Sequence, residues 1–583
     1  MSENTASIII DGSSYTFNST GTEKEKRKLL QFALDSGVEI PYFCYHEGMS
    51  IPTNCRMCLI EMGMPMVDRA TGQPVLDEAG EPKINWSHKP LTSCNLDLAP
   101  GMIVKTAKTS PKIKKAQEGV LEFMLINHPL DCPICDQAGE CPLQINTYKF
   151  GPEGSRYELS KVHKPKRIEL GQNVTLDAER CINCTRCTRF TEEISKTDQL
   201  TIVSRGDKNH PSVAPGKTFD DAYSMNVIDL CPVGALTSTD FRFKARVWEM
   251  SYTPSLCTGC AKGCSVDVWV KDNQVLRQTP RENRQINDWW MCDEGRLDFD
   301  KLNTTRVSGI KAKGDLPLTF DDGIHKAAEM LKSAQDRNRV LFVASPYASL
   351  ESNIALSNLA KAYNNSQVVF VENTQAGWGD NFLRRDDRTP NRAACIMLGF
   401  TPISVEELNS RISVAELSYM LENDALMSHL AETLKAGAKV IVHASNHSAA
   451  LESAAIVLPA ATHIESPGIY LNENSVAQLS RQAKEIRQMS PEMWMSMSKS
   501  RNDKGAVFKD NWKNIENIVD CLPSYAIISR IAKKAGIAQI AESHKEAFAE
   551  AKHTFPEALK DLKLSRFVPK ESFKMHQFEF AIN

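Results

Sequence analysis

The hydrophobic and polar positions near the N-terminus predict two short strands followed by a helix. Residues 7–17 read SIIIDGSSYTF, and the pair Asp11-Gly12 within them is a strong signal for a two-residue hairpin turn. A charged, helix-prone run follows at residues 22–35 and stops at Gly37. We therefore expect a strand, a turn, a strand and a helix before the first cysteine.

Three further patterns organise the chain up to residue 280. Residues 62–90 are rich in turn-forming residues and predict an exposed loop or hairpin. Residues 112–128 predict a helix, because their apolar side chains recur at helical spacing. The sequences VDVWV at 266–270 and QVLRQ at 274–278 alternate as strands do, with Asp272-Asn273 between them. These last two segments predict a second hairpin.

The pattern changes after Asn303 to alternating strand and helix signals. Residues 340–346, VLFVASP, precede a helical stretch at 350–365, and QVVFVEN follows at 367–373. Residues 438–445, AKVIVHAS, form a similar strand signal before residues 450–468. Such repeats predict a doubly wound α/β domain, whose ligand sites lie at the strand ends. From Ser524 onward we expect a polar helical tail, whose Lys and Glu runs make a solvated face or a partner contact.

Composition narrows the class of protein. The chain has 583 residues, 42% hydrophobic and 24% charged, with a net charge of -3. This composition is typical of a soluble globular protein of several domains, and it lacks the basic surface expected for nucleic-acid binding. No apolar run is long enough for a membrane span, and the start MSENTASIII lacks the features of a secretory signal. We therefore expect a cytoplasmic protein without direct membrane insertion.

Cysteine is the residue that points to chemistry. The chain has 17 cysteines, and all except Cys395 and Cys521 fall into four sets, one of which is completed by a histidine. The sets are Cys44, Cys55, Cys58 and Cys94; His128, Cys132, Cys135 and Cys141; Cys181, Cys184, Cys187 and Cys231; and Cys257, Cys260, Cys264 and Cys292. Grouped CxxC spacing in a cytoplasmic protein indicates metal binding rather than disulfides.

The spacing within each set indicates which metal group it would hold. A hairpin, a helix, three clustered cysteines and a distant fourth follow the order of a plant-type [2Fe-2S] ferredoxin, although the gap from Cys44 to Cys55 is wider than in that class. The triplet CxxCxxC with a remote Cys-Pro at Cys231 is the bacterial pattern for a [4Fe-4S] cluster. For the set with His128, a tuned [4Fe-4S] cluster and a structural zinc both remain possible.

Other residues could be proposed as ligands. His46 and His88 lie near the first set, where four cysteines already suffice, and exposed positions in loops are the simpler interpretation. His163 is a weaker alternative to His128. Cys395, in the apolar stretch RAACIMLGF, is expected to be a buried thiol rather than a metal ligand.

The four sets, in this order and at these gaps, resemble the large iron-sulfur subunit of bacterial complex I, the proton-pumping NADH:quinone oxidoreductase. The resemblance is strong over residues 1–300 and moderate over 305–490. It implies one [2Fe-2S] cluster at the first set and a [4Fe-4S] cluster at each of the other three. It also implies that the first three clusters relay electrons from flavoprotein subunits toward a ferredoxin-like subunit and quinone, while the fourth lies off that route.

Residues 254–490 are also similar to molybdopterin oxidoreductases, but they depart from that pattern. Relatives that use the cofactor commonly carry Cys-x-Lys-Gly after the fourth cysteine, whereas this chain has Cys292-Asp293-Glu294-Gly295. Near residues 367–377 no cysteine is present as a molybdenum ligand. We therefore expect a degenerate domain without molybdopterin.

The expected fold class is multidomain α+β and α/β. The predicted parts are a β-grasp [2Fe-2S] ferredoxin-like domain (1–105), a one-His/three-Cys [4Fe-4S] domain (106–160), a ferredoxin-like [4Fe-4S] domain (161–248), a molybdopterin-oxidoreductase-type [4Fe-4S] domain (249–305), an α/β domain without cofactor (306–520) and a helical tail (521–583).

The resemblance implies an electron-relay subunit with no catalytic residues of its own, peripheral on the cytoplasmic side of the inner membrane through its complex. The alternatives are the iron-sulfur/molybdopterin subunit of an NAD-linked formate dehydrogenase, a hydrogenase subunit, and a zinc-scaffolded interaction protein. No flavin or nicotinamide site is visible in the sequence, so NADH and quinone sites are expected on partner subunits.

Overall fold

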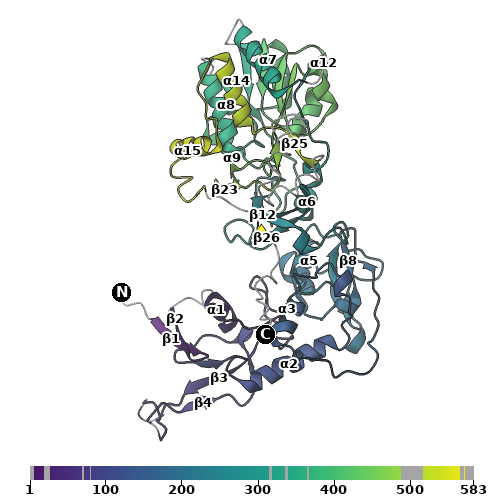
Figure 1. The fold of residues 1–583 in the computed structure, drawn as a ribbon, viewed down its shortest axis with the longest axis vertical. Helices are drawn as coiled ribbons and strands as arrows, with labels where there is room; N and C mark the ends of the chain where they lie inside the picture. Colours follow the sequence, from purple (N-terminus) through teal and green to yellow (C-terminus); the bar gives the residue numbers. More distant parts are fainter. Residues whose placement is uncertain are drawn as a thin grey trace, which may run out of the picture. The chain divides into compact units, whose positions relative to one another are not determined.

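The computed structural model describes residues 5–18, 27–68, 71, 73–78, 80–313, 318–334, 339–363, 367–487, 517–564 and 570–571. The chain divides after Val247 into two compact units, each described by itself below (Figure 1). The start of the predicted first helix, part of the predicted α/β domain and most of the predicted tail after residue 564 lie outside the described residues.

The first unit begins with the predicted hairpin. Strands β1 (Thr5–Ile10) and β2 (Ser13–Asn18) pair antiparallel. Asp11 and Gly12 between them have φ values of 49° and 84°, the left-handed conformation that a two-residue type I′ turn requires. The hairpin prediction is confirmed.

This hairpin belongs to a mixed sheet that carries the first cysteine set. The sheet runs β2-β1-β6-β3-β4, with β5 beside β3, and β1 pairs parallel with β6. The added strands are β3 (Leu59–Pro65), β4 (Ile84–Trp86), β5 (Leu91–Thr92) and β6 (Ile103–Lys105). Between β3 and β4 the described residues form bridges from Val67 to Pro74 and from Leu76 to Pro82, in keeping with the loop or hairpin expected there.

Helix α1 (Leu29–Asp35) packs Leu29, Leu30 and Ala33 into the core of this sheet. The sequence placed the helix start at residue 22, but Lys28 is extended and forms a β-bridge with Asp97. The Leu29 amide also donates to the Leu96 carbonyl at 2.8 Å. A tertiary contact therefore decides where the helix begins, and helix propensity at Lys28 is overridden.

Helix α2 (Pro111–Leu125) carries the chain toward His128. Its N-cap Ser110 accepts a hydrogen bond from the Ile113 amide, and Pro111 occupies the first helical position, where its missing N–H costs nothing. The helix ends three residues before His128, so the predicted helix exists but is shorter at its C-terminus. The remaining elements of this unit are η2 (Cys132–Ile134), α3 (Pro142–Phe150), β7 (Ile168–Glu169), β8 (Val174–Leu176), η3 (Ala178–Arg180), α4 (Arg186–Arg189), η4 (Phe190–Ile194), β9 (Thr201–Val203), η5 (Gly206–Lys208), β10 (His210–Ser212), α5 (Asn226–Leu230) and β11 (Leu236–Ser238).

The second unit opens with an antiparallel sheet that holds the fourth cysteine set. Strands β12 (Ser251–Leu256), β13 (Ser265–Lys271) and β14 (Gln274–Pro280) are neighbours, and β26 (Lys570–Glu571) pairs with β12. Asp272 and Asn273 have φ values of 54° and 58°, so the predicted second hairpin is confirmed. The short helix α6 (Asp293–Leu297) follows Cys292.

The α/β part of the second unit is built on one seven-stranded sheet. Its order is β15-β21-β20-β19-β16-β17-β18, and all neighbours except β15 and β21 pair parallel. The strands are β15 (Lys311–Ala312), β16 (Val340–Val343), β17 (Val368–Val371), β18 (Thr401–Ile403), β19 (Leu417–Met420), β20 (Val440–Ala444) and β21 (Ile456–Pro459). Numbered by their order in the chain, the six parallel strands lie 3-2-1-4-5-6, which is the doubly wound arrangement.

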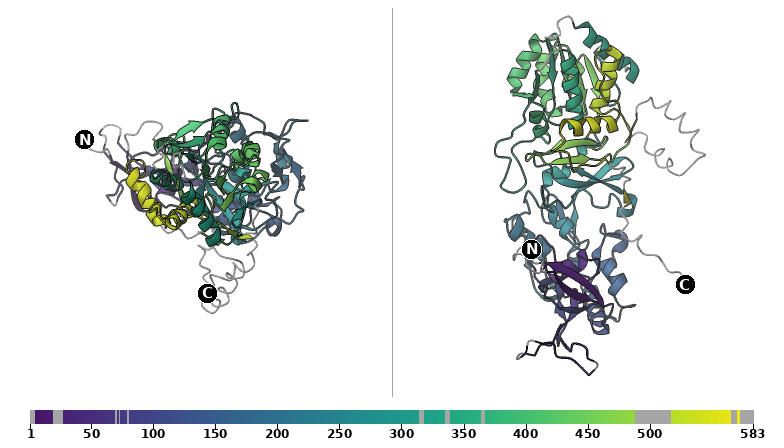
Figure 2. Two further views of the ribbon diagram at one scale, coloured as in Figure 1. Left: turned by 90° about the horizontal axis from the view of Figure 1, so that it is seen from above. Right: turned by 90° about the vertical axis from the view of Figure 1, so that its left-hand side faces the viewer.

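Helices cover both faces of this sheet (Figures 1 and 2). Helices α7 (Phe320–Ser333), α8 (Leu350–Ala362) and α14 (Ser524–Ala535) pack on one face, and α10 (Val405–Val414) and α12 (Ala431–Lys435) pack on the other. The α/β part also contains helices α9 (Arg392–Met397), α11 (Asp424–Met427) and α15 (His544–Thr554) and the 3-10 turns η7 (Asp300–Leu302), η9 (Ser428–Leu430) and η10 (Ala449–Ser453). Two further strand pairs are the hairpin β22 (Gly468–Leu471) with β23 (Ala477–Ser480) and the parallel pair β24 (Ile486–Arg487) with β25 (Val519–Asp520).

Helix α14 corrects the expectation of a tail from Ser524, although the lysines Lys533 and Lys534 are exposed, as expected for a solvated face. The helix exists, but Ile527, Ile528 and Ile531 are fully buried in the same core as β16 and α7. Its apolar residues recur every three or four positions, so one face is hydrophobic although the average composition is polar. The part of the chain after residue 521 is therefore integral to the α/β fold as far as residue 564.

A buried hydrogen-bonded chain ties α14 to the sheet. His443 lies in β20 with its Nε2 2.8 Å from the Tyr419 hydroxyl and its Nδ1 2.9 Å from Ser524 Oγ. Ser524 in turn donates to a carboxylate oxygen of Glu422 at 2.5 Å. Burial lowers the pKa of His443 to about 3 and raises the pKa of Glu422 to about 7.

Replacing His443 with glutamine should change how stability depends on pH. Unfolded His443 takes up a proton below its ordinary pKa of 6.5, whereas the folded side chain stays neutral to about pH 3. Its contribution to the free energy of unfolding is therefore complete above pH 6.5 and falls by about 1.4 kcal/mol per pH unit below it. Glu422 acts in the opposite sense between about pH 4.5 and 7, because the folded carboxyl binds its proton first.

The two contributions are separated by comparing wild type with His443→Gln. The difference in unfolding free energy, followed by hydrogen exchange of β20 amides in urea, should shrink steadily as the pH falls below 6.5. A difference that is independent of pH would contradict a neutral buried imidazole.

Candidate iron-sulfur sites

The four cysteines of the first set are buried in the first unit. Cys44 lies in the loop after α1, Cys55 and Cys58 immediately precede β3, and Cys94 lies in the 3-10 turn η1 (Ser93–Asn95). A hydrogen bond between the Cys44 and Cys55 thiols lowers the pKa of Cys55 and raises that of Cys44, and a hydrogen bond between Cys94 and Cys58 lowers the pKa of Cys58 and raises that of Cys94. Thiolate is the form that binds metal, so this buried group of four suits a soft metal centre.

His46 and His88 do not join this group. The ring of His46 accepts a hydrogen bond from the Gly48 amide through Nδ1 at 3.1 Å, and His88 is exposed.

The second set surrounds the turn between α2 and α3. Cys132 begins η2, Cys135 follows it, and Cys141 is the N-cap residue of α3. His128 Nδ1 is buried and has no hydrogen-bond partner among the described residues. Burial, together with the nearby Arg180, lowers the pKa of His128 to about 4. A neutral imidazole with an unpaired buried nitrogen fits a metal ligand. Without a metal, this nitrogen would be a buried polar atom that lacks a partner.

The alternative ligand His163 is placed differently. Its side chain is 84% exposed, and its Nδ1 lies 2.8 Å from a Glu179 carboxylate oxygen. Part of the second site reaches the surface as well, because Cys132 is exposed and its neighbours Leu130 and Ile134 are 89% and 57% exposed.

The third set lies where α4 and α5 meet. Cys181 follows η3, Cys187 lies within α4, and Cys231 directly follows α5. Burial raises the pKa of the Cys181 thiol to about 12 and that of Cys184 to about 11. Metal binding to these thiols would therefore release protons, and it would replace buried thiols by thiolates held on a metal.

Direct contacts join the third site to the first. Two arginines of α4 reach the loop of the first set: Arg189 Nη2 donates to the Cys44 carbonyl at 2.6 Å, and Arg186 Nη2 donates to the Tyr45 carbonyl. Asn54, beside Cys55, donates to the Asn183 carbonyl at 3.4 Å. The loop of the first set and helix α4 of the third set are therefore in direct contact.

Other contacts join the third site to the second. The Cys141 thiol donates to the carbonyl of Pro232, the residue after Cys231, at 3.7 Å. Gly234 leaves room for the second set, because a Cβ at this position would lie 2.1 Å from Cys135 Sγ. Arg180, the residue before Cys181, donates to the Gly234 carbonyl at 3.4 Å and pairs with Asp131, the residue before Cys132, at 2.9 Å.

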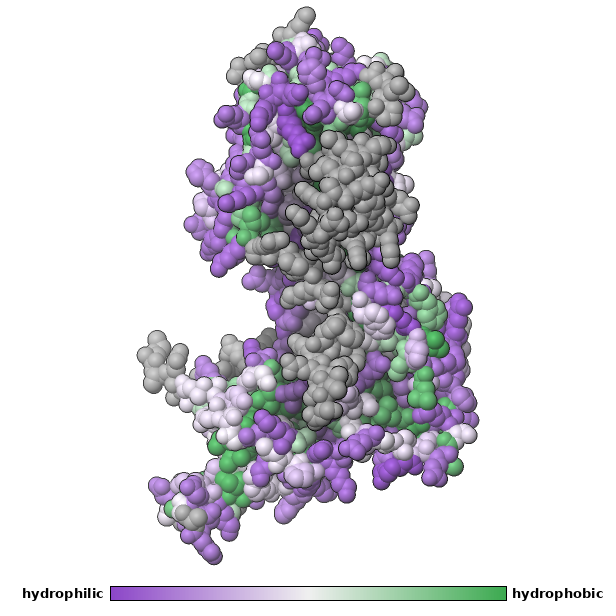
Figure 3. Space-filling view, viewed as in Figure 1, coloured by the Kyte–Doolittle hydropathy of each residue, from purple (hydrophilic) through white to green (hydrophobic). Residues whose placement is uncertain are grey.

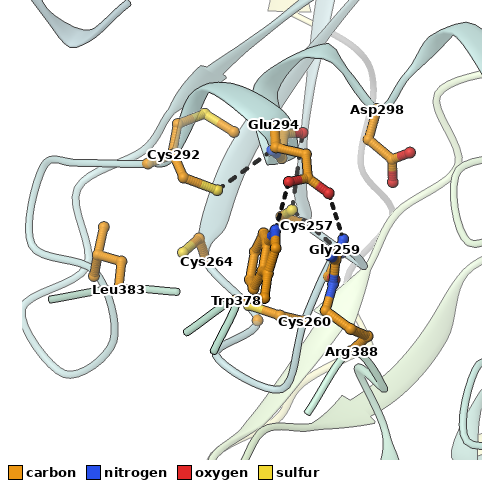
Figure 4. Close-up of a pocket in the computed structure, with 13 residues that line it drawn as sticks. Cys257, Gly259, Cys260, Cys264, Cys292, Glu294, Asp298, Trp378, Leu383 and Arg388 are labelled. Atoms are coloured by element: carbon orange, nitrogen blue, oxygen red, sulfur yellow. Dashed lines mark hydrogen bonds and ion pairs between the residues drawn. The ribbon is translucent and has the colours of Figure 1, made fainter. Parts of the chain in front are cut away.

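The fourth set lines one pocket of the second unit (Figure 4). Cys257, Cys260 and Cys264 lie in the loop between β12 and β13, and Cys292 caps α6. The Gly259 amide donates to Cys257 Sγ at 3.4 Å and the Gly295 amide donates to Cys292 Sγ at 3.3 Å, contacts that favour thiolate. Four thiols around one pocket are better explained as ligands of a single iron-sulfur cluster than as four cysteines that each only fill space in the core.

Glu294 closes this pocket with two partners. Its carboxylate pairs with Arg388 at 2.7 Å and accepts from Trp378 Nε1 at 2.7 Å (Figure 4). Arg388 also stacks 3.8 Å above the Trp378 ring and donates to the Gly259 carbonyl at 2.8 Å. We refer to Glu294, Trp378 and Arg388 as the clasp; it ties the cysteine loop to residues 374–388 of the α/β part.

A separate cavity of about 420 Å³ lies at the carboxyl ends of the parallel strands. This is where the strand order reverses between β16 and β19 and where such folds bind ligands. Gly259 and Arg388 line both this cavity and the pocket of the fourth set. The charged residues on its wall are Asp298, Lys301, Arg388, Glu422 and Asp424.

Cys395 and Cys521 lie outside all four sites. Cys395 is fully buried in the apolar core of the α/β part, as predicted from its surroundings, and burial raises its pKa. Cys521 is also fully buried, with its thiol 4.0 Å from Glu465. Among the described residues, no three histidine, cysteine or acidic side chains converge closely enough to hold a single metal ion.

Sequence reasoning missed the arginines. Arg180, Arg186 and Arg189 flank the third set, and the clasp partner Arg388 lies 94 residues from Glu294. The first three lie beside cysteines in the sequence, so they could have been noticed; the pairing of Arg388 with Glu294 leaves no sequence signal.

Three family models match the chain. Residues 117–156 match the NADH-ubiquinone oxidoreductase-G iron-sulfur binding region, and residues 171–237 match the ferredoxin-like domain of NADH-quinone oxidoreductase subunit 3. Residues 250–303 match the molybdopterin oxidoreductase Fe4S4 domain. These ranges contain the second, third and fourth sets, respectively.

Curated relatives agree with these models. The G subunit of the NADH-quinone oxidoreductase of Rickettsia bellii is 34% identical over 400 residues, which cover 67% of this chain and 54% of that protein. The NADH-ubiquinone oxidoreductase 75 kDa subunit of Reclinomonas americana is 36% identical over 371 residues, covering 63% and 49%. The NADH-quinone oxidoreductase subunit 3 of Thermus thermophilus is 36% identical over 361 residues, covering 58% and 45%. The chain spans about half the length of these relatives.

A solved structure, that of an NAD+-reducing [NiFe]-hydrogenase in its H2-reduced state, is 24% identical and covers 42% of this chain and 91% of that one. Its TM-score of 0.32 is too low to establish a shared fold. The sequence relatives and the matched iron-sulfur models agree with each other: over its iron-sulfur region the chain is similar to the G subunits of NADH-quinone oxidoreductases.

Proposed function

We propose that this chain is an electron-relay subunit of an NADH:quinone oxidoreductase complex. The observation that carries the proposal is that short contacts through Arg189, Pro232 and Gly234 link the first three cysteine sets in one row within the first unit. The first set would hold a [2Fe-2S] cluster in a β-grasp ferredoxin-like domain, and the other sets would each hold a [4Fe-4S] cluster. When bound, such a cluster takes up and releases one electron at a potential set by its net charge, its hydrogen bonds and its exposure.

The residues that join the sites support the order first, third, second. Arg186 and Arg189 connect the first set with the third, and Pro232 and Gly234 connect the third set with the second. This order differs from the order of the sets along the chain. The exposed edge at Cys132, Leu130 and Ile134 would then be the side from which electrons leave toward a partner.

The fourth site is proposed to lie off this route, and the adjoining cavity to hold no molybdopterin. Molybdopterin carries a phosphate, whose binding cations favour, but Arg388 is paired with Glu294, and Lys301 is paired with Asp298 at 2.5 Å. Glu422 and Asp424 add negative charge to the same wall. The carboxylate of Glu294 also occupies the position where cofactor-binding relatives commonly place lysine. The side chains present therefore do not fit that cofactor.

Electron paramagnetic resonance of the anaerobically purified, dithionite-reduced chain tests the proposal. We expect signals of one two-iron and three four-iron clusters, with matching iron and acid-labile sulfide. A colourless zinc protein would refute the relay. Molybdenum or tungsten found by elemental analysis would favour a formate dehydrogenase subunit instead.

Replacing Cys260 with alanine should leave electron transfer in the assembled complex largely intact. Cys260 is a buried member of the fourth set, and its loss should remove that cluster and the folding energy that metal binding contributes. We expect a lower unfolding temperature of the second unit, measured by calorimetry, with nearly normal NADH:quinone turnover. A collapse of turnover in a correctly assembled complex would place the fourth site on the route.

We propose the flavoprotein subunits and a ferredoxin-like subunit leading to quinone as partners, with the chain peripheral on the cytoplasmic side of the inner membrane. The face drawn in Figure 3 is mainly hydrophilic, with hydrophobic side chains in small patches. In the described part of the chain, no helix combines the length and the hydropathy of a membrane span.

A further inference from the structure

Arg189 occupies an unusual place between two candidate cluster sites. It lies in α4, two residues after Cys187 of the third set, and only 7% of it is exposed. Its guanidinium donates from Nη2 to the Cys44 carbonyl at 2.6 Å and from Nη1 to the Ser50 carbonyl. The guanidinium of Arg189, a residue beside the third set, thus contacts the backbone of the first set's loop.

The first-site loop is held from both sides at Ser50. While Arg189 binds the Ser50 carbonyl, Glu193 of η4 accepts a hydrogen bond from the Ser50 amide at 2.8 Å. Arg189 Nε also approaches Thr185 Oγ1 at 3.5 Å, which anchors the guanidinium to its own helix. A planar fork with donors in fixed directions can bridge two carbonyls in this way, whereas a lysine ammonium cannot fix the same geometry.

The charge of Arg189 acts on both sites. Its hydrogen-bond acceptors among the described residues are neutral carbonyls and a hydroxyl, and Glu193, one turn further along the chain, offsets part of its charge from a distance. Cys184 of the third set and Cys44 of the first set both interact with it electrostatically. Burial strengthens such interactions, because little water screens them.

We propose that Arg189 is a positioning residue that fixes the spacing of the first and third sites and raises the reduction potentials of both. The proposal rests on the proposed function, since it requires clusters at these sets. A fixed cation stabilises the more negative, reduced form of a cluster, so its effect on potential has a definite sign. Because Arg189 contacts the first site from within the third, the second and fourth sites should not respond.

The test compares Arg189→Met, which removes the charge at similar length, with Arg189→Lys, which keeps it. The full chain with its clusters is titrated in redox steps followed by electron paramagnetic resonance. In Arg189→Met the equilibrium constant for reduction of the first and third clusters should fall at least about tenfold. This change lowers each reduction potential by about 59 mV for one electron. Arg189→Lys should keep the potentials of both clusters close to those of the wild type, because the charge is retained. It should weaken the magnetic interaction between the two clusters, because lysine does not fix their spacing.

Arg167→Met is the matched control, because Arg167 is 70% exposed and pairs with Glu169 on the surface. It should leave all four potentials unchanged. Wild-type potentials in Arg189→Met, or an equal shift at all four sites, would overturn the proposal. If Arg189→Met fails to retain its clusters, Arg189→Gln replaces it in the titration, and potentials in the glutamine variant equal to those in the lysine variant would also overturn it.

Failure of this inference can be told apart from failure of the proposed function. A wild-type chain without the first and third clusters refutes the function itself. If the wild-type chain holds four clusters and their potentials do not change when Arg189 is replaced, only the role of this arginine is refuted.

Discussion

Replacing Cys184 with alanine should abolish electron transfer from flavin to quinone in the assembled complex. Cys184 is a buried member of the third set, and residues beside this set contact both the first and the second set. An alanine removes one of four thiolates, and the loop around Cys184 is fixed by positive φ values at Asn183 and Thr185, so it cannot readily bring in another donor. With the central site lost, the row of sites is interrupted between its two outer members.

The measurement is NADH:quinone turnover beside NADH-dependent reduction of an artificial acceptor by the flavoprotein subunits. The first should fall to the rate seen without this chain, and the second should persist. Cys395→Ala is the matched control, since it removes a fully buried thiol that belongs to no set. An unimpaired quinone rate in Cys184→Ala would exclude the third site from the main route.

The local elements could be predicted because their signals lie within a few neighbouring residues. Asp11-Gly12 and Asp272-Asn273 specify their turns through the positive φ values that these residue types tolerate. The end of α1 was also marked in sequence, since Gly37 takes a φ of 78°. Its beginning was not, because the bridge from Lys28 to Asp97 joins residues far apart in the chain.

The α/β fold class could be predicted, but its strand order could not. Alternating strands and helices imply a parallel sheet, while the choice of β16 and β19 as central neighbours depends on packing across the whole domain. The same limitation explains α14. Its polar average suggested a solvated tail, and only the sheet on which Ile527 and Ile531 pack shows that its apolar face is core.

Cysteine spacing predicted the composition of the candidate sites but not their arrangement. The sets were grouped by intervals along the chain, and each grouping implies local loops. Which site touches which depends on long-range contacts, such as Arg189 with Cys44, 145 residues apart. The clasp is similar, because Glu294 was recognised as a departure from lysine although its partner Arg388 was not.

Together these contacts separate two roles within one chain. In the first unit, Arg186, Arg189, Pro232 and Gly234 link the three cysteine sets through short contacts. In the second unit, the ion pair of Glu294 with Arg388 lies at the fourth set, and Gly259, Asp298 and Arg388 line both this set's pocket and the cavity beside it. An electron relay requires short distances between neighbouring clusters, whereas a cluster off the route must lie apart from that row. The proposed function therefore depends on the polar side chains around the cysteines as well as on the cysteines themselves.

Gly234→Ala should remove the second site while leaving the third in place. The added Cβ would lie 2.1 Å from Cys135 Sγ and 3.1 Å from the Gln137 Cβ, both inside van der Waals contact. A free thiol could rotate away from the new methyl group at little cost. A thiolate held on a cluster cannot, so the clash falls on metal binding at Cys135 rather than on the fold.

We therefore expect Gly234→Ala to fold, to retain the signals of the first and third clusters, to lose that of the second and to stop quinone reduction. Gly154→Ala is its control, because a Cβ there meets no atom within 4 Å and the backbone φ is ordinary. A complete second-cluster signal in Gly234→Ala would show that Cys135 is not held in place, and the second site would then need a different ligand. Loss of the third signal as well would show that the two sites, which meet at Gly234, are filled as one unit.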